Sequence, residues 1–402
     1  MKDFVYHVPT RVIFGKNTQD QVGNLVKEFG GNKVLILSGS QSTAKSGLLA
    51  QVEKSLRDCS IAYCRKSGVM PNPRLSFVRQ VLALIEEEKV DFILALGGGS
   101  VIDCAKAVAI GACYQGDVWD LFARKAVPQN ILSLGVVLTL PAAGSETSKF
   151  SVITNDESSE GWLKRGLYYE KASPLFAILN PELTYTLPPY QTACGAVDIM
   201  MHTMERYFSP QTDTDLTDYL AEGVLKAVIK NAPVALLCPD DYQARSEIMW
   251  AGSVSHNDLT GLGRNADFAT HQLEHELSGL YDVAHGAGLS ALWGSWARYV
   301  MGSHIWRFVQ FAVNIWHLEA DYLNPQKTAL QGIEKTEEFF SSLGMPITIK
   351  ELMQQYNLPL PTQKELEEMT QKCTFFGKRS IGTFQVLNSD DILRIYQLAL
   401  SR

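Results

Sequence analysis

Strand-like runs alternate with helical patterns over the first 187 residues, and this alternation limits the possible folds more than any other feature. The runs 33–39, 91–96 and 131–141 are short and apolar, as is typical of buried strands, and helical spacing separates them. Strands joined by helices of this length form right-handed crossovers, which place the strands in a parallel sheet covered on both faces. The sequence therefore predicts an α/β dinucleotide-binding domain over residues 1–187.

The pattern changes at a boundary where prolines stand at positions 181, 188 and 189. Each proline removes a backbone donor and resists continuation of a strand or a helix. Beyond them, strand-like alternation nearly vanishes, and helical spacing occupies the windows 189–208, 214–233, 240–258 and 325–343. We therefore expect an all-α domain over residues 188–402.

The composition excludes several classes of protein. Of the 402 residues, 46% are apolar and 20% are charged, so the chain can bury a sizeable core. The net charge is −7 and no basic block is present, which argues against a nucleic-acid partner. There is neither a run of about 18 apolar residues nor an apolar export signal at the start, so we expect a cytoplasmic protein without a membrane partner. The seven scattered cysteines form no CxxC pair, which fits neither a disulfide framework nor a zinc knuckle.

A glycine run follows the second predicted strand, in the segment LALGGGSVIDCAKA at 94–107. Glycines let a backbone approach a ligand closely, and the free N–H groups in the first turn of the following helix favour an anion such as a pyrophosphate. The spacing is not GxGxxG, and the run does not follow the first strand. A glycine-rich turn without any ligand is the alternative interpretation.

The end of the first predicted strand carries a signal about the cofactor. Many dinucleotide sites have an acidic side chain there, which binds the ribose diol and repels a 2′-phosphate. This chain has Ser38, Gly39 and Ser40 in that region and no carboxylate, which favours NADP and leaves NAD possible. An ordinary Gly-Ser turn explains these residues equally well.

Asp198 and His202 stand four positions apart in the apolar run GAVDIMMHTME at 195–205. This spacing places both side chains on one face of a helix. A carboxylate buried among such residues costs several kcal/mol unless something compensates it, and a divalent cation would do so. The alternative is a paired aspartate beside an ordinary core histidine.

Three further histidines, His271, His275 and His285, lie within ATHQLEHELSGLYDVAHGAG at 269–288. We expect Asp198, His202, His271 and His285 to converge from three segments. One carboxylate and three imidazoles suit Fe²⁺ or Zn²⁺ as a Lewis acid. A purely structural zinc site is the alternative, although intracellular sites of that kind favour cysteine.

These segments resemble the iron-containing alcohol dehydrogenase family, in particular its butanol dehydrogenase and NADPH-dependent aldehyde reductase branch. The resemblance runs nearly end to end, through HVPTRVIFG, GVMPNP, GGGSVIDCAK, TLPAAGSE, NPELTYTLPPYQTACGAVDIMMHTME, HQLEHELSGLYDVAHGAG and IGTFQVL. It implies an α/β cofactor domain followed by an all-helical metal domain, the architecture shared with dehydroquinate synthase. It also implies a homodimer.

The resemblance also assigns roles to residues. The four metal-ligand positions are occupied by Asp198, His202, His271 and His285, and His275 matches an additional active-site histidine that is not a ligand. The pyrophosphate loop corresponds to Gly97, Gly98, Gly99 and Ser100. The remaining cofactor positions are Asp103 at the nicotinamide end, Thr139 and Leu140 along the cofactor, Asn72 on the adenosine side and Lys164 near the nicotinamide ribose.

Three positions distinguish this chain within the family. Members that require NAD typically carry Asp where Gly39 stands, which strengthens the preference for NADP. Asn180 stands where the family usually has Asp, and Phe268 where the branch often has Trp. These last two departures bear on the shape of the pocket and on substrate preference.

The function that the resemblance implies is reversible hydride transfer between NADP(H) and a small aldehyde or primary alcohol, such as butanal or butanol. The metal ion would polarise the carbonyl oxygen, and His275 would relay a proton to it. A metal- and NAD-dependent lyase resembling dehydroquinate synthase is one alternative, although the segments around the histidines lack the basic character that its substrate needs. A metal-storing or nucleotide-sensing protein without turnover is the other.

Overall fold

The computed structural model describes residues 1–39 and 41–402, which form two compact units. We call them the sheet unit, which comprises His7–Pro188 and Cys238–Ser253, and the helical unit, which comprises Met1–Tyr6, Pro189–Leu237 and Val254–Arg402. The segment Cys238–Ser253 therefore groups with the sheet unit although it follows residue 188. Compactness does not establish which segments fold independently, so the contiguous domains 1–187 and 188–402 stay a prediction.

The sheet unit contains a six-stranded sheet in which every neighbouring pair is parallel, in the order β1-β8-β5-β4-β2-β3. The three predicted strands are confirmed as β2, β4 and β5. The bounds of the strands are Arg11–Phe14 for β1, Lys33–Ser38 for β2, Ala62–Ser67 for β3, Phe92–Gly98 for β4, Ser133–Leu140 for β5 and Phe176–Leu179 for β8.

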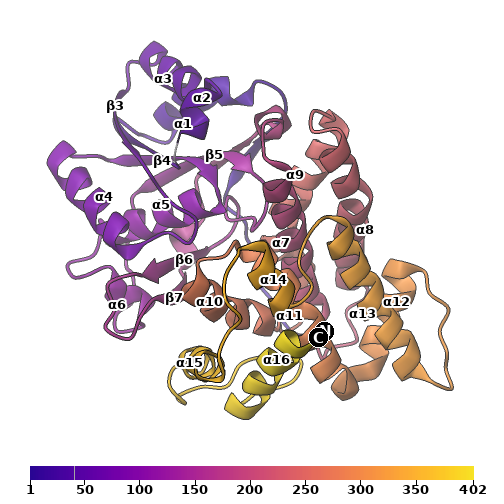
Figure 1. Ribbon diagram of the computed structural model, residues 1–402. Coiled ribbons are helices and arrows are strands. Elements are labelled where there is room, and N and C mark those ends of the chain that lie inside the picture. Colours follow the sequence, from indigo (N-terminus) through magenta and orange to yellow (C-terminus); the bar gives the residue numbers. More distant parts are fainter. Residues whose placement is uncertain (40) are drawn as a thin grey trace. The chain divides into compact units, whose positions relative to one another are not determined.

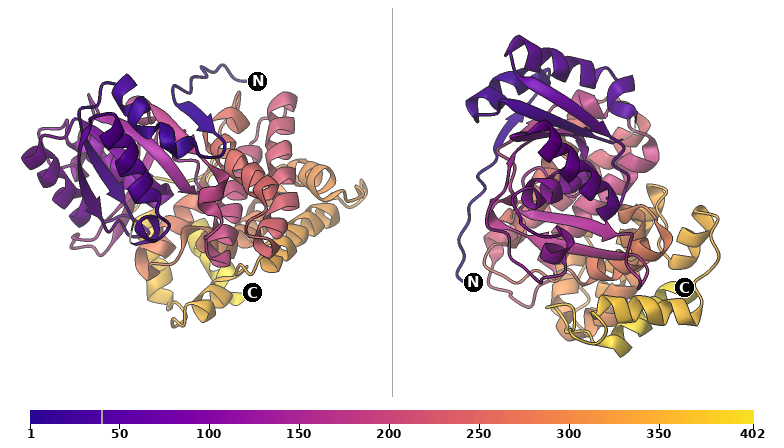
Figure 2. Two further views of the ribbon diagram at one scale, coloured as in Figure 1. Left: turned by 90° about the horizontal axis from the view of Figure 1, so that it is seen from above. Right: turned by 90° about the vertical axis from the view of Figure 1, so that its left-hand side faces the viewer.

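Alternation along the central strands explains why helices cover both faces of this sheet. On β2, Leu35 and Leu37 belong to one apolar cluster, whereas Val34 and Ile36 belong to another. The first cluster includes residues of α4 (Leu75–Glu88) and α5 (Gly99–Gly111), and the second includes residues of α1 (Val22–Glu28) and α3 (Leu48–Asp58). Figures 1 and 2 show these two pairs of helices on opposite sides of the sheet.

The remaining elements of the sheet unit are short, apart from α9. A separate antiparallel hairpin, formed by β6 and β7, was not predicted. The elements are α2 (Ser42–Lys45), α6 (Trp119–Phe122), β6 (Phe150–Asn155), β7 (Leu163–Tyr168), the 3₁₀ turns Thr18–Gln21, Glu170–Ala172 and Pro181–Thr184, and α9 (Tyr242–His256), whose last three residues belong to the helical unit.

Apart from its N-terminal segment, the helical unit consists of helices and the loops that join them, as predicted (Figure 1). The predicted windows 189–208, 214–233, 240–258 and 325–343 correspond to α7, α8, α9 and α13. The helices are α7 (Pro189–Tyr207), α8 (Asp215–Leu237), α10 (Ala269–Tyr281), α11 (His285–Val300), α12 (Ile305–Trp316), α13 (Pro325–Ser342), α14 (Ile349–Gln355), α15 (Gln363–Cys373) and α16 (Ser389–Ser401), with 3₁₀ turns at Leu259–Gly261 and Met301–His304. In the part of the chain that the structure describes, no helix is both long and apolar enough to span a bilayer.

Close packing of α7 against α11 sets the position of the candidate site. A Cβ atom on Gly286 would lie 2.2 Å from the backbone oxygen of Cys194, so only glycine allows this approach. Gly286 follows the first residue of α11, and Cys194 stands one turn before Asp198 on α7. The missing side chain therefore brings the start of α11 directly against the middle of α7.

Candidate metal centre and cofactor site

The four predicted metal ligands come together in the helical unit. His202 Nδ1, His285 Nε2 and His271 Nε2 lie 3.0, 3.8 and 3.9 Å from Asp198 Oδ1. The side chains of Asp198, His202 and His271 are each 6% exposed, and that of His285 is 25% exposed. The convergence that the sequence predicts is therefore present.

Local chain geometry places each of these side chains. Asp198 and His202 share one face of α7, because they stand four residues apart on a helix. His271 lies in the first turn of α10. That helix ends at Tyr281, followed by Asp282 in the left-handed conformation with φ 52°, and His285 is the first residue of α11. The interruption at Asp282 thus separates α10 from α11, and the close packing at Gly286 brings α11 against α7.

All three imidazoles use their Nδ1 atoms to bind the protein. His202 Nδ1 lies 3.0 Å from the backbone oxygen of Asp198, and His271 Nδ1 lies 3.1 Å from Oε1 of Glu205. His285 Nδ1 contacts Oε2 of Glu274. Since carbonyl and carboxylate oxygens only accept hydrogen bonds, each Nδ1 donates and each Nε2 is the atom left for a metal ion. The three rings are therefore in the tautomer that binds a metal through Nε2.

Two buried atoms at the point of convergence test whether a cation fits. Asp198 Oδ1 and His271 Nε2 are inaccessible to solvent, and neither makes a hydrogen bond among the described residues. Polar atoms buried in this way cost about 1–3 kcal/mol each unless a partner satisfies them. Two ligands about 2.1 Å from one ion at a tetrahedral angle are about 3.4 Å apart. The Nε2 atoms of His285 and His271 lie 3.8 and 3.9 Å from Asp198 Oδ1, close to this separation. The residues fit a divalent ion.

The ionisation of these groups agrees with a site prepared for a cation. Burial raises the pKa of Asp198, but His202 and His285 outweigh it and hold that pKa well below its usual range. Burial lowers the pKa of His202 to about 4, so this ring is neutral at pH 7. Burial also lowers the pKa of His271, but the carboxylates of Asp198 and Glu205 outweigh it and raise the pKa to about 9. A metal ion would therefore displace a proton from His271.

His275 lies beside the ligands rather than among the four. It stands one turn after His271 on α10 and is half-buried, and its ring centroid is 5.9 Å from that of His285. Its side chain also comes close to Glu274 and His285, within a group whose ligand atoms lie within 4.8 Å of one another. This position is compatible with the predicted proton relay, which stays a prediction.

Two residues around the predicted metal ligands, His256 and Arg206, were not identified from the sequence. The ring of His256 lies 4.3 Å from that of His202, and Arg206 donates to Nδ1 of His256 over 2.9 Å. Phe268 packs on the ligands, with its ring centroid 5.2 Å from that of His271. Phe268, which stands where the branch often has Trp, therefore packs directly on the predicted metal ligands. His256 stands 54 positions after His202, so no local pattern could have connected them.

The glycine run of the sheet unit is confirmed as the junction of β4 and α5. A Cβ atom on Gly97 would lie 2.4 Å from Cγ2 of Val101, and one on Gly98 would lie 2.9 Å from Cβ of Leu140. Internal packing therefore requires both glycines whether or not a ligand binds. At Gly99 the nearest atom would be the Cβ of Ala143 at 3.6 Å, an ordinary contact, so packing does not explain this glycine.

Asp103 holds two segments of its own unit. Its carboxylate accepts a hydrogen bond from the Ser145 hydroxyl over 2.5 Å and another from the Val152 N–H over 3.0 Å. The predicted contact between Asp103 and the nicotinamide end of a cofactor stays a prediction. Lys106, one turn further along α5, was not singled out from the sequence. Its ammonium group is fully buried and donates to the backbone oxygens of Ser145 and Phe150.

Asp103 and Lys106 together fix the segment that follows Thr139 and Leu140, the two predicted cofactor residues at the end of β5. Ser145 is held by both side chains, since its hydroxyl donates to Asp103 and its backbone oxygen accepts from Lys106. The loop expected to run along the cofactor is therefore anchored from α5. Ser100 lies in the first turn of that helix.

Asn72 and Lys164, two of the predicted cofactor residues, are in direct contact. Lys164 Nζ donates to Asn72 Oδ1 over 3.0 Å, and both side chains are buried. The sequence analysis placed Asn72 on the adenosine side and Lys164 near the nicotinamide ribose. The contact joins two predicted cofactor positions, and their roles toward the cofactor stay predictions.

The end of β2 has room for the acidic residue that it lacks. A Cβ atom on Gly39 would lie 3.7 Å from the backbone oxygen of Val69 and 3.8 Å from Cγ2 of Val101, which are ordinary contacts. Ser38 donates to the hydroxyl of Ser67 over 3.1 Å. The absence of a carboxylate at residue 39 is therefore not imposed by packing. The predicted residue Ser40 lies outside the described residues.

Comparison with known proteins assigns the chain to a family. Residues 9–181 match the iron-containing alcohol dehydrogenase family, and residues 192–400 match the C-terminal part of the Fe-containing alcohol dehydrogenases. The chain belongs to the iron-containing alcohol dehydrogenase family. It is therefore an enzyme and an oxidoreductase, which favours the dehydrogenase interpretation over the lyase that resembles dehydroquinate synthase.

Individual relatives place the chain in the branch that the sequence indicates. The NADH-dependent butanol dehydrogenase A of Clostridium acetobutylicum is 36% identical, with 99% of each chain covered. The NADPH-dependent aldehyde reductase YqhD of Escherichia coli is 32% identical, with 99% of this chain and 100% of the relative covered. The crystal structure of NADH-dependent butanol dehydrogenase A from Thermotoga maritima superposes with a TM-score of 0.94 at 34% identity, covering 100% of this chain and 99% of that chain.

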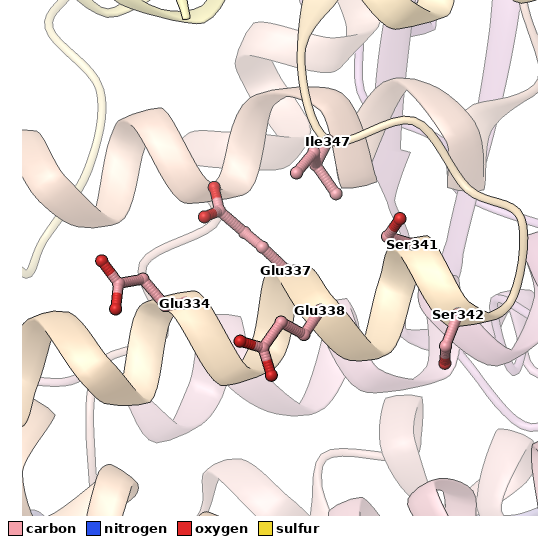
Figure 3. Close-up of a pocket in the computed structure, with 6 residues that line it drawn as sticks. All are labelled: Glu334, Glu337, Glu338, Ser341, Ser342 and Ile347. Carbon is pink, nitrogen blue, oxygen red and sulfur yellow. The ribbon is translucent and has the colours of Figure 1, made fainter.

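A hollow elsewhere on the helical unit is unrelated to the candidate site (Figure 3). Its lining residues, mostly from α13, are Glu334, Glu337, Glu338, Ser341, Ser342 and Ile347. The carboxylate of Glu337 is already bound by Arg298 over 2.7 Å and by Arg402 over 2.7 Å. Because its most buried charge is neutralised within the protein, this hollow offers nothing that recognises an aldehyde or a nucleotide.

Proposed function

We propose that the protein is a metal-dependent alcohol dehydrogenase or aldehyde reductase that transfers hydride between NADP(H) and small aldehydes or primary alcohols of the butanal and butanol type. The observation that carries this proposal is the convergence of Asp198, His202, His271 and His285, with buried ligand atoms left unsatisfied. The resident ion is Fe²⁺, in keeping with the family, and Zn²⁺ suits the same donors. The functional unit is a homodimer, as the resemblance to the family implies.

The chain's own residues contribute binding and orientation to this reaction. When bound, the divalent ion supplies Lewis acidity to a carbonyl oxygen and the reduced nicotinamide supplies a hydride. Asp198 and the three imidazoles hold the ion, and Glu205 and Glu274 keep the rings of His271 and His285 in place. His275 moves a proton to or from the substrate oxygen.

The sheet unit supplies the cofactor residues of the proposal. The backbone at Gly99 and Ser100 binds the pyrophosphate at the start of α5, which has no side-chain cap of its own. Gly97 and Gly98 give this turn its shape. Asp103 lies at the nicotinamide end of the cofactor, and Thr139 and Leu140 lie along it. Asn72 is on the adenosine side, and Lys164 is near the nicotinamide ribose.

NADP(H) is the preferred cofactor in this proposal, and NAD(H) is also accepted. The support is Gly39, where no carboxylate is available to repel a 2′-phosphate. The names of the relatives include both NADH-dependent and NADPH-dependent enzymes. The ratio of kcat/KM for NADPH and NADH tests this part directly.

The decisive experiment follows NADPH oxidation with butanal before and after the metal is removed. We expect turnover in protein loaded anaerobically with Fe²⁺, loss of turnover on chelation, and recovery when Fe²⁺ or Zn²⁺ is restored. Binding of NADPH, followed by its fluorescence, is measured on the same samples to show that the chelated protein is still folded. Absence of turnover in metal-loaded protein with several aldehydes would leave a storage or sensing role instead.

A further inference from the structure

The three imidazoles of the candidate metal centre share one arrangement but differ in the group that holds them. His202 donates to a peptide carbonyl, whereas His271 and His285 donate to the carboxylates of Glu205 and Glu274. We propose that Glu274 is a positioning residue, which fixes the ring of His285 and strengthens the binding of the divalent ion, and that Glu205 acts in the same way on His271. This inference rests on the metal site of the proposed function.

His285 is the ligand that most needs such support. Its side chain is 25% exposed, compared with 6% for His202 and His271, so packing restrains its ring least. It is also the first residue of α11, where the helix has only begun. A hydrogen bond to its Nδ1 is therefore the main restraint on the direction of its Nε2 lone pair.

Glu274 is placed to give that restraint. Its carboxylate is fully buried, and its Oε2 atom contacts Nδ1 of His285. It stands on α10, three residues after His271, so one turn of this helix contributes both a ligand and the support of another ligand. Burying a carboxylate without compensation costs several kcal/mol, and an imidazole that donates to it offsets part of that cost.

The packing of α11 leaves room for this carboxylate. A Cβ atom on Gly288 would lie 2.8 Å from Cγ of Glu274 and 2.9 Å from its Oε1 atom. Gly288 stands three residues after His285, on the same side of α11. The backbone of one helix therefore passes directly over the Glu274 side chain, and any larger residue at 288 would displace it.

Glu205 holds His271 through two contacts. Its Oε1 atom accepts from the backbone N–H of His271 over 3.0 Å and lies 3.1 Å from the ring Nδ1. The side chain is 2% exposed and stands one turn after His202 on α7. Each of the two glutamates thus follows one ligand along its own helix and supports a ligand on another helix: Glu205 of α7 supports His271 of α10, and Glu274 of α10 supports His285 of α11.

The chemical consequence is a more basic and better oriented ligand. A carboxylate that accepts the Nδ1 proton raises the electron density at Nε2 and fixes the ring, and loss of such a partner costs about 10- to 100-fold in metal affinity. We expect this loss for Glu274→Gln, because the amide keeps the size of the side chain but removes its charge.

The test measures metal affinity rather than turnover. Metal-free wild type and Glu274→Gln are titrated with Zn²⁺ against a chromophoric chelator, and the absorption bands of the Co²⁺ forms report the ligand geometry. For Glu274→Gln we expect an affinity for Zn²⁺ weaker by about 10- to 100-fold and altered Co²⁺ bands. We expect the thermal midpoint of the metal-free variant to be close to that of metal-free Glu276→Gln, the control.

The matched control is Glu276→Gln. Glu276 is also buried and also lies on α10. It stands two residues after Glu274, which places its side chain about 200° further around the helix. Equal losses of affinity in the two variants would show a general effect of removing buried charge from α10 and would overturn the proposal. An unchanged affinity and unchanged Co²⁺ bands in Glu274→Gln would overturn it as well.

A second variant keeps the test decisive if Glu274→Gln does not fold. Gly288→Ala leaves every ionisable group in place and displaces only the Glu274 side chain, so it should weaken metal binding in the same direction. If both variants fold, their combination should weaken binding by less than the product of the two single effects, because both act through one contact. Independent effects would contradict this coupling.

The metal stoichiometry separates this role from a rival one. Ligand atoms of Glu274, His275 and His285 lie within 4.8 Å of one another and could themselves hold a cation. Binding of two equivalents by the wild type, with one lost in Glu274→Gln, would make Glu274 a ligand and overturn the positioning role. If the wild type binds no metal, the proposed function itself fails, whereas a wild type that binds one equivalent leaves the comparison of variants valid.

Discussion

The glycine turn of the sheet unit and the metal centre of the helical unit were both identified from short motifs, but they differ in how far the protein satisfies its own groups. At the turn, Gly97 and Gly98 are required by internal contacts, and Asp103 and Lys106 bind their own chain. At the metal centre, Asp198 Oδ1 and His271 Nε2 are buried without a hydrogen bond among the described residues. A motif that the fold itself requires is weak evidence of a ligand, whereas buried unsatisfied atoms at one point are strong evidence.

The largest expected effect tests the metal side of this comparison. His271→Ala removes one of four ligands and the atom that most clearly lacks a partner. We expect metal content after dialysis to fall below about one tenth of that of the wild type, and NADPH-dependent reduction of butanal to fall by a factor on the order of 10³. His7→Ala, which changes an exposed histidine far from His271 in the sequence, should leave the metal content and the activity unchanged. Retention of a full equivalent of metal in His271→Ala would contradict the ligand assignment.

A buried carboxylate that the protein does satisfy gives the second prediction. Asp218 of α8 is bound by Arg264 and by Arg307, which lies 2.5 Å from its Oδ2 atom. Asp218→Asn leaves two buried guanidinium groups without their counter-charge, and we expect a loss of about 3–5 kcal/mol in the free energy of unfolding. Denaturant unfolding of the metal-free protein measures it. A loss below about 1 kcal/mol would show that this network contributes little.

The same residue gives the stability a defined dependence on pH. Burial raises the pKa of Asp218, but Arg307 and Arg264 outweigh it and lower the pKa below its usual value. The stabilisation is therefore fully present above the unfolded pKa of about 3.9 and is lost as the pH falls through the lower folded pKa. Asp218→Asn should lack this part of the acid sensitivity when thermal midpoints are compared between about pH 5 and pH 3.

The third prediction compares Gly97, which internal packing requires, with Gly99, which it does not. Gly97→Ala forces a Cβ atom against the stiff side chain of Val101, so we expect a loss of about 1–3 kcal/mol in stability. Gly99→Ala has space and should change stability by less than about 1 kcal/mol, while raising the KM for NADPH. Thermal unfolding and steady-state kinetics on both variants make the comparison. If Gly99→Ala left the KM unchanged, the ligand-binding role of this turn would be refuted.

The smallest expected effect concerns the choice of cofactor. Gly39→Asp introduces a carboxylate at a position where the Cβ atom has ordinary contacts. Repulsion of a 2′-phosphate should lower the ratio of kcat/KM for NADPH to that for NADH by about tenfold or more, equivalent to about 1.4 kcal/mol. Gly39→Asn, which has the same shape without the charge, is the control. Equal ratios in the Asp and Asn variants would mean that charge at residue 39 does not select the cofactor.

Sequence periodicity predicted the elements that carry their own pattern. The buried strands β2, β4 and β5 and the helices α7, α8, α9 and α13 follow from local spacing. The hairpin of β6 and β7 was missed. The grouping of Cys238–Ser253 with the sheet unit was also not foreseen, because it depends on contacts such as that of Thr147 with Ser253, 106 positions apart.

From the sequence, the candidate site could be predicted only through its most distinctive residue type, histidine. Histidines are rare in this chain, so their clustering identified the candidate metal ligands, whereas glutamates are common and carried no comparable signal. Glu205 meets His271 across 66 positions, and Lys164 meets Asn72 across 92. Tertiary packing brings such partners together, and no spacing rule within a single sequence connects them.

The turn between α10 and α11 has a consequence for how this chain can vary in length. Only Asp282, Val283 and Ala284 separate Tyr281 from His285, and the two helices contact each other. One inserted residue in either helix would rotate every later side chain by about 100°. We therefore expect insertions to be tolerated in the loop of residues 317–324, between α12 and α13, but not between His271 and Gly288, where the chain length sets the spacing of two proposed metal ligands, His271 and His285.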